Sequence, residues 1–222
     1  MINVLLTDDH ALVRTGVRRL LEDSKKVKVI GEADSGELCC DKVIELKPDI
    51  TLMDLNMPGI GGLEACRRIL QHDPEQKIII LSIHTEHTFP KRMLEIGARG
   101  YLTKECDVHT MVSAIQTVHN GGSFIEPRIA QQLAMSMMPG NHHLMDRLSR
   151  REFQVMLLMV NGLTNAVISE KLCLSPKTVS TYRSRILEKI DAENEVELVK
   201  LAVEMGLVDF SQQKIADMMA QS

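Results

Sequence analysis

The 222-residue sequence contains no tryptophan, and aromatic residues make up only 3% of it. A hydrophobic core must therefore be built mainly from aliphatic side chains and from the 14 methionines. No stretch approaches the roughly 18 consecutive apolar residues of a membrane-spanning helix, so membrane insertion is not expected. The N-terminal segment has neither the basic start nor the apolar stretch of a secretory signal. These absences favour a cytoplasmic protein.

The sequence also lacks paired cysteines. Its five cysteines are an odd number and include no C-x-x-C pair. We therefore expect reduced thiols rather than a disulfide framework or a zinc site. The net charge of −4 excludes a uniformly basic nucleic-acid-binding surface, although it does not exclude a local one.

Strand-like and helix-like patterns alternate five times between residue 3 and about residue 120. Apolar runs such as 77–83 are typical of buried strands, whereas 36–46 has the apolar spacing of a helix. Pro48 follows that helix closely, as expected where a helix ends. Five such units predict an α/β fold with a doubly wound, five-stranded parallel sheet.

Four of the predicted strands end in residues that carry chemistry. The central one is the apolar run that ends at Asp54 and is followed by an Asn-Met-Pro-Gly loop. The other three end in an acid pair, a hydroxyl and an ammonium group: Asp8-Asp9, Ser82 and Lys104. The carboxyl ends of parallel strands share one edge of the sheet, where such sheets bind ligands. The sequence therefore predicts that these groups meet in one crevice.

Each of these residues also has an ordinary structural explanation. Asp54 could cap its loop, Ser82 could cap its strand, and Lys104 could form a strand-end salt bridge. Adjacent carboxylates such as Asp8 and Asp9 repel each other, however, and usually need a cation. All four strand ends together favour a functional site over four separate caps.

Residues 123–146 differ in character from the alternating region before them. They contain prolines and the dipeptide Pro139-Gly140 around one helix-like patch over 129–138, which predicts an interdomain linker with a short helix. His142-His143 could bind a metal ion. No carboxylate or cysteine cluster accompanies the pair, so a solvated linker is the favoured interpretation.

From Arg147 onward all patterns are helical. A short helix over 165–172, a tight turn and a longer helix over 176–190 predict a helix-turn-helix, with Ser175 as the N-cap and proline at the first helical position. Residues 195–205 form a fourth helix that is apolar almost all round. One small domain cannot bury every face of that helix, so we expect a partner helix, most simply from a second copy of the chain.

Basic charge gathers on the longer helix of this motif. Residues 176–189 hold four basic side chains and one acid, which suits contact with DNA phosphates. With Val179, Tyr182 and Ile186 facing inward, the outward side chains would face the major groove. These outward positions are Lys177, Ser180, Thr181, Ser184 and Arg185. The alternative is a solvated basic face with no partner.

These motifs resemble a known family. The strand-end residues, with Tyr101 on the fifth strand, resemble the phosphoacceptor site of bacterial response-regulator receiver domains. The segments 148–152, 162–165 and 175–179 resemble the LuxR-type helix-turn-helix. The combination is that of the NarL/FixJ class of response regulators. Within this class, segments 1–10 and 175–183 are most similar to the GacA-type global activators.

The resemblance implies that Asp54 accepts a phosphoryl group from a sensor histidine kinase. It also implies a Mg²⁺ ion, which prefers oxygen ligands in octahedral geometry and usually keeps several waters. Asp9 and Asp54 would bind the ion directly and Asp8 would bind it through water. The backbone carbonyl of Asn56 would supply a further ligand.

The remaining receiver residues would act on the phosphoryl group. Lys104 would pair with the incoming group, and the hydroxyl of Ser82 would donate a hydrogen bond to one of its oxygens. Tyr101 would be the switch, turning into the space that opens as Ser82 and Lys104 move. The alternative for Tyr101 is a half-buried residue at the sheet edge.

The resemblance also implies a transcription factor that binds double-stranded DNA as a homodimer. It would not be an enzyme, beyond self-phosphorylation and slow self-dephosphorylation. The implied DNA-binding residues are Lys177, Thr178, Ser180, Thr181, Arg183, Ser184 and Arg185, and the implied dimerisation residues are Leu198, Val199 and Ala202. The implied division is a receiver domain over 1–122, a linker over 123–146, a DNA-binding domain over 147–207 and a polar tail over 208–222.

Three other functions fit the sequence less well. A metal-dependent phosphohydrolase using Asp54 would need a second acid where Asn56 stands. A dinucleotide-binding loop would need glycine where Glu64 stands, and no P-loop motif occurs. A quorum-type small-molecule sensor would need a ligand pocket in place of strands that end in acids. A phosphorylation-controlled transcription factor is therefore the leading prediction.

Overall fold

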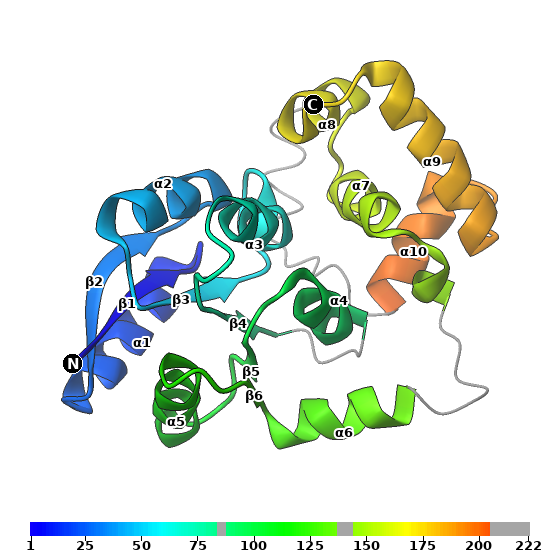
Figure 1. The fold of residues 1–222 in the computed structure, drawn as a ribbon. Coiled ribbons are helices and arrows are strands. Elements are labelled where there is room, and N and C mark those ends of the chain that lie inside the picture. Colours follow the sequence, from blue (N-terminus) through cyan, green and yellow to red (C-terminus); the bar gives the residue numbers. More distant parts are fainter. Residues whose placement is uncertain (84–87, 137–143, 205–222) are drawn as a thin grey trace. The chain divides into compact units, whose positions relative to one another are not determined.

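The computed structural model describes residues 1–83, 88–136 and 144–204 (Figure 1). The chain divides into two compact units, Met1–Met138 and Pro139–Ser222. His142-His143 and the predicted tail over 208–222 lie outside the described residues.

The first unit contains a parallel sheet of six strands in the order β2-β1-β3-β4-β5-β6, with helices on both faces (Figure 1). The chain builds the sheet outward from β1, first to one edge and then to the other, which is the predicted doubly wound topology. The strands are β1 (Ile2–Thr7), β2 (Val27–Ala33), β3 (Ile50–Asp54), β4 (Ile78–Ser82), β5 (Gly100–Thr103) and β6 (Phe124–Ile125). The helices are α1 (Ala11–Asp23), α2 (Gly36–Leu46), α3 (Gly61–His72), α4 (Thr88–Ile96), α5 (Val108–His119) and α6 (Pro127–Ser136).

Alternating side chains of the central strands fill the space on both faces of the sheet. Val4 and Leu52 belong to a buried cluster with residues of α5 such as Ile115. Leu5 and Met53, their neighbours in the chain, are also fully buried and point to the opposite face, because successive strand residues alternate in direction. Helices α1 and α5 contact each other, and α3 contacts both α2 and α4, so two helical layers enclose the sheet.

The sixth strand corrects the predicted strand count. Phe124 and Ile125 pair with Gly100 and Tyr101, so the sheet continues past the predicted receiver boundary at residue 122. A strand of two residues is too short to show a period in the sequence. The helix predicted over 129–138 begins earlier, at Pro127, because proline suits the first helical position.

The second unit is helical and contains the predicted helix-turn-helix. Its elements are a 3-10 helix η1 (Leu144–Arg147) followed by α7 (Arg150–Val160), α8 (Asn165–Leu172), α9 (Pro176–Ile190) and α10 (Glu195–Glu204). Ser149, Thr164 and Ser175 cap the starts of α7, α8 and α9 by accepting hydrogen bonds from backbone N–H groups in the first turn. Within the described ranges, no helix is both long enough and apolar enough to cross a membrane.

Candidate functional site

The strand ends converge as predicted, and an ammonium group joins two carboxylates there. Nζ of Lys104 lies 2.6 Å from Oδ2 of Asp8 and 2.8 Å from Oδ2 of Asp54. The side chains of both acids are 1% exposed and that of Lys104 is 14% exposed. Three residues from three strand ends therefore form one buried ionic cluster.

Burial and charge act against each other in this cluster. Burial raises the pKa of Asp54 above its ordinary value and outweighs the opposing effect of Lys104. For Lys104, burial alone would lower the pKa, but the charges and hydrogen bonds of Asp54 and Asp8 outweigh it and raise the pKa. The ammonium group thus stays protonated beside a carboxylate whose charge is costly to bury.

Backbone groups fix the second oxygen of each acid. The N–H of His10 donates to Oδ1 of Asp8 at 2.8 Å, and the N–H of Asn56 donates to Oδ1 of Asp54 at 3.1 Å. Arg14 of α1 donates from Nη1 to the carbonyl oxygen of Asp8 at 2.6 Å. The two backbone N–H bonds hold the carboxylates, and the Arg14 bond holds the backbone of Asp8.

Two glycines let the loop after Asp54 close tightly on the site. A Cβ atom on Gly62 would lie only 2.1 Å from the carbonyl oxygen of Asp54, so only glycine lets the start of α3 approach so closely. Gly59 has a φ of +79°, a conformation that other residues rarely adopt. The glycines that suggested a loop in the sequence are therefore required by its geometry.

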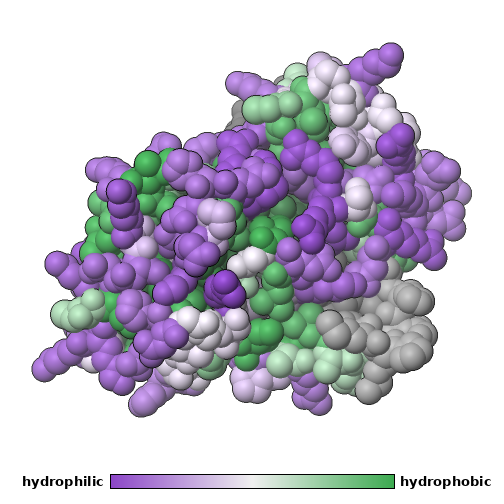
Figure 2. All heavy atoms as spheres, viewed as in Figure 1, coloured by the Kyte–Doolittle hydropathy of each residue, from purple (hydrophilic) through white to green (hydrophobic). Residues whose placement is uncertain are grey.

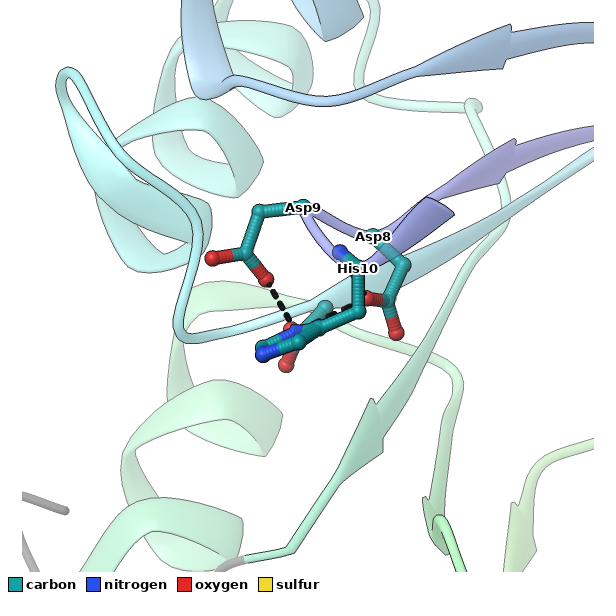
Figure 3. Close-up of side chains that lie close together, drawn as sticks. Asp8, Asp9 and His10 are labelled. Carbon is teal, nitrogen blue, oxygen red and sulfur yellow. Dashed lines mark hydrogen bonds and ion pairs between the residues drawn. The ribbon is translucent and has the colours of Figure 1, made fainter. Parts of the chain in front are cut away.

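Asp9 and His10 complete a group of possible metal ligands. Asp8, Asp9, His10 and Asp54 each offer a ligand atom, and these atoms all lie within 4.8 Å of one another. Figure 3 shows the first three side chains converging. Nδ1 of His10 lies 2.8 Å from Oδ1 of Asp9, an ion pair if the imidazole is protonated. This buried oxygen has no hydrogen-bond partner among the residues that the structure describes.

This donor set fits a divalent cation. Carboxylate oxygens from two separate strand ends, one of them a buried atom without a hydrogen bond, are the ligands that Mg²⁺ prefers. His10 was not predicted as a ligand, although it directly follows the acid pair. Its imidazole is a ligand better suited to transition metals than to Mg²⁺.

Ser82 and Tyr101 lie next to this cluster and contact each other. Both side chains are fully buried, and the Tyr101 hydroxyl is hydrogen-bonded to the side chain of Ser82. Burial, chiefly, raises the pKa of Tyr101. Tyr101 is fully buried rather than half-buried, and it is turned inward with no phosphoryl group present. The inward turn predicted to follow phosphorylation therefore does not match this structure.

The outward face of α9 carries the predicted basic and hydroxyl side chains. The surface over α9 that is visible in Figure 2 is largely hydrophilic. In the described part of the chain, the side chains of Lys177 and Arg185 form no ion pair. The exposed residues on this face are Lys177, Ser180, Thr181, Ser184 and Arg185.

Two other predicted DNA-binding residues are engaged within the unit. Arg183 donates from Nε to Oε1 of Glu195 at 2.9 Å and from Nη1 to Oδ1 of Asn165 at 2.6 Å, so it connects α9 to α10 and α8. The Thr178 hydroxyl lies 2.8 Å from that of Ser175, the N-cap of α9. Both side chains therefore position the helix in this structure.

Two protein families match the two units. Residues 4–116 match the response regulator receiver domain, and residues 146–202 match the bacterial regulatory proteins of the luxR family. The chain is also 50% identical to the response regulator GacA of Pseudomonas aeruginosa, over 94% of this chain and 99% of that protein.

The chain is a GacA-type response regulator. It is likewise 46% identical to the response regulator UvrY of Escherichia coli K12, over 93% of this chain and 96% of that protein. A solved structure of RcsB from Salmonella enterica serovar Typhimurium, bound to promoter rprA with the phosphomimetic BeF3⁻, has a TM-score of 0.73. Its sequence identity is 25%, over 90% of this chain and 98% of that one. The matches establish a response regulator with a LuxR-type DNA-binding domain.

The last helix of this response regulator corrects two of the predicted dimerisation residues. Leu198 and Ala202 are fully buried within the unit, whose α10 contacts α7 and α9. They belong to the core of the unit and offer no surface to a partner in this structure. Val199 is partly exposed, and the most exposed apolar side chains of α10 are Val196, at 66%, and Val203, at 42%.

Proposed function

We propose that Asp54 is the phosphoacceptor of this response regulator and that Lys104 pairs with the incoming phosphoryl group. The supporting observation is the Lys104 ammonium, which bridges the buried carboxylates of Asp8 and Asp54. A sensor histidine kinase is the donor that the receiver domain implies. Phosphoryl transfer depends chiefly on positioning and on neutralising charge, and the cluster supplies both.

Asp8, Asp9 and Asp54 would hold Mg²⁺, with the backbone carbonyl of Asn56 as a further ligand. When bound, the ion neutralises negative charge on the oxygens of the transferred group. Oδ1 of Asp9 supports this assignment, because it is buried and has no hydrogen-bond partner within the described part of the chain. The N–H of Asn56 holds Oδ1 of Asp54 and the ammonium of Lys104 holds Oδ2, so both oxygens of the acceptor are positioned.

Ser82 and Tyr101 would respond to the new group. A phosphoryl group adds roughly 1.5 to 2 negative charges and three strong acceptor oxygens. The Ser82 hydroxyl would donate to one of those oxygens, and its hydrogen bond with Tyr101 would then rearrange. Tyr101 is therefore the residue we expect to report phosphorylation to the surface beside β5.

The output is DNA binding by the second unit. The exposed residues of α9 would contact the major groove, with Lys177 and Arg185 reaching phosphates or base edges. The exposed Val196 and Val203, with Val199, would form the contact between two copies. The protein would act in the cytoplasm, where its DNA lies, and would catalyse only its own phosphorylation and slow dephosphorylation.

The test is phosphoryl labelling of the full chain with acetyl phosphate and Mg²⁺, followed by intact-mass measurement. We expect one phosphoryl group on the wild type and none on Asp54→Asn. Asp41→Asn is a matched control, because Asp41 is an exposed aspartate on α2, and it should label like the wild type. Undiminished labelling of Asp54→Asn would place the acceptor elsewhere.

A further inference from the structure

The edge strand β6 stops before its neighbour β5 does. Register pairs Phe124 with Gly100 and Ile125 with Tyr101, and the N–H of Glu126 donates to the carbonyl of Tyr101 at 3.0 Å. Continued at the regular spacing of a parallel ladder, β6 would next offer a backbone acceptor to Thr103. The chain instead turns into α6 at Pro127.

The Glu126 side chain supplies the acceptor that the missing strand would have provided. Its Oε2 accepts a hydrogen bond of 2.8 Å from the N–H of Thr103. Thr103 is buried, so its N–H would otherwise lack a partner, at a real cost in stability. A bond from N–H to a carboxylate is also stronger than one between neutral groups.

Glu126 is at the same time the first residue of the turn into α6. Its carbonyl accepts a hydrogen bond of 2.9 Å from the N–H of Ala130. Helix α6 contacts α4 and buries Ile129 and Leu133. In the sequence, α6 is the last described element before the DNA-binding unit. Glu126 thus contacts β5 at both Tyr101 and Thr103, and it also begins α6, the helix that precedes the DNA-binding unit in the sequence.

We propose that Glu126 is a positioning residue that transmits movement of the Tyr101–Lys104 segment to α6. The inference rests on the proposed function, in which Tyr101 and Lys104 respond to phosphorylation. Nζ of Lys104 already lies 2.8 Å from Oδ2 of Asp54, so a phosphoryl group added to Asp54 would displace Lys104, and the peptide of Thr103, which directly precedes it, would move with it. The carboxylate of Glu126 holds that peptide, and therefore the start of α6 moves with it.

The carboxylate also has a purely structural explanation, in which it only completes the hydrogen bonds of the sheet edge. The two roles give different results in a coupling measurement. Loss of a structural bond lowers stability but leaves unchanged the ratio of DNA affinities with and without phosphorylation. Loss of a coupling bond lowers that ratio even when Asp54 is fully labelled.

The experiment measures this ratio for the full chain, using acetyl phosphate with Mg²⁺ and a DNA duplex selected by the wild type from a random pool. Glu126→Asp keeps the charge, but its shorter side chain cannot reach the N–H of Thr103. Glu126→Ala loses both the charge and the acceptor oxygen, whereas Glu126→Gln loses the charge and keeps an acceptor oxygen. We expect Glu126→Asp and Glu126→Ala to lower the phosphorylation-dependent gain in affinity by about fivefold or more. Glu126→Gln should stay within about twofold of the wild type, because its bond to Thr103 is retained.

Two controls separate the possible failures. Glu105→Ala removes an exposed acid beside Lys104 and should leave the gain unchanged. Hydrogen exchange of the Thr103 amide should be faster in Glu126→Asp and unchanged in Glu126→Gln, which tests the bond without DNA. If Glu126→Ala fails to fold, Glu126→Asp still decides the question.

Glu126→Asp could show faster hydrogen exchange at Thr103 and still keep the wild-type gain in DNA affinity on phosphorylation. If the wild type is labelled, that result would overturn this inference and leave the proposed function standing. Equal loss in Glu126→Gln and Glu126→Asp would also overturn it, since the acceptor oxygen would then be irrelevant. An unlabelled wild type would overturn the proposed function and this inference with it.

Discussion

The two functional regions of this response regulator hold their charges in opposite ways. In the receiver unit, Asp8, Asp54 and Lys104 come from distant parts of the sequence and are buried against one another. On α9, Lys177 and Arg185 are near neighbours in sequence and are exposed. Buried charges depend on each other, whereas exposed charges contribute nearly independently. Mutations should therefore have large, cooperative effects in the first region and small, additive effects in the second.

The largest effect is expected for Lys104→Ala. The substitution leaves two buried carboxylates without their cation, which should destabilise the receiver unit by about 3–5 kcal/mol. Denaturant unfolding without Mg²⁺ measures this loss, and Lys104→Arg, which keeps the charge, should lose less. Mg²⁺ should then stabilise Lys104→Ala more than the wild type, because the ion can replace the missing charge. Wild-type stability of Lys104→Ala without metal would refute the idea of mutual dependence.

A steric effect should come next. In Gly62→Ala the new Cβ would overlap the carbonyl oxygen of Asp54, so we expect destabilisation of about 2–3 kcal/mol and slower labelling. Gly16→Ala is the matched control, because none of the described atoms would lie within 4 Å of the added Cβ. It lies within α1 and should gain up to about 1 kcal/mol from the better helix propensity of alanine. Thermal unfolding measures the change in stability of each variant, which should be a loss for Gly62→Ala and a gain for Gly16→Ala. Equal losses of stability in the two variants would contradict the packing argument.

Opposite pH dependences should distinguish the two units. For Glu152, burial favours a higher pKa, but hydrogen bonds from Lys189 and Ser149 outweigh it and lower the pKa. A lowered pKa means that Glu152 stabilises its unit above its ordinary pKa, and that this stability is lost as pH falls through the lowered value. Glu152→Gln should therefore cost about 1–2 kcal/mol at pH 7 and little well below a pH of about 4.

Asp54 has the reverse sign, because its pKa is raised. Ionising Asp54 in the folded protein lowers stability, and this loss develops as the pH rises from the ordinary pKa of an aspartate through the raised pKa of Asp54. Asp54→Asn should therefore be more stable than the wild type at neutral pH. Hydrogen exchange, measured separately in the two units between acidic and neutral pH, gives the stability change of Glu152→Gln and of Asp54→Asn and so checks both predicted signs. If both variants lost stability, or both gained it, as the pH rose, the proposed difference between the units would be wrong.

The smallest effects should come from the exposed face of α9. Lys177→Ala and Arg185→Ala should each weaken DNA binding and lower the slope of log affinity against log salt by about 1, with little change in stability. Arg183→Ala should instead lower the stability of the helical unit by about 1 kcal/mol or more, since Arg183 links α9 to α8 and α10. If Arg183→Ala instead lowered the salt slope by about 1 and left stability unchanged, Arg183 would be a DNA-contacting residue.

The contrast also explains how much could be predicted from the sequence. Strand ends such as Asp54 and Lys104 were predictable because a parallel sheet brings its carboxyl ends to one edge whatever their separation in sequence. Helix bounds such as Gly36–Leu46 followed from apolar spacing and from a nearby proline. Apolar spacing and turn residues were sufficient to predict an element wherever the apolar pattern was long.

Short elements and all-round patterns were not predictable in this way. The two residues of β6 are too few to carry a period. A helix that is apolar almost all round does not show which face packs on its own unit, so Leu198 and Ala202 were misassigned. The roles of Arg183 and Glu126 depend on partners 12 and 23 residues away, and no spacing rule indicates such contacts.

The central claim is that charge added to Asp54 changes how the second unit binds DNA. The most direct test is DNA affinity of the wild type and of Asp54→Asn, each measured with and without acetyl phosphate and Mg²⁺ on the same duplex. We predict a gain of about fivefold or more for the wild type and none for Asp54→Asn. Equal gains in both proteins, or no gain in a fully labelled wild type, would contradict the claim.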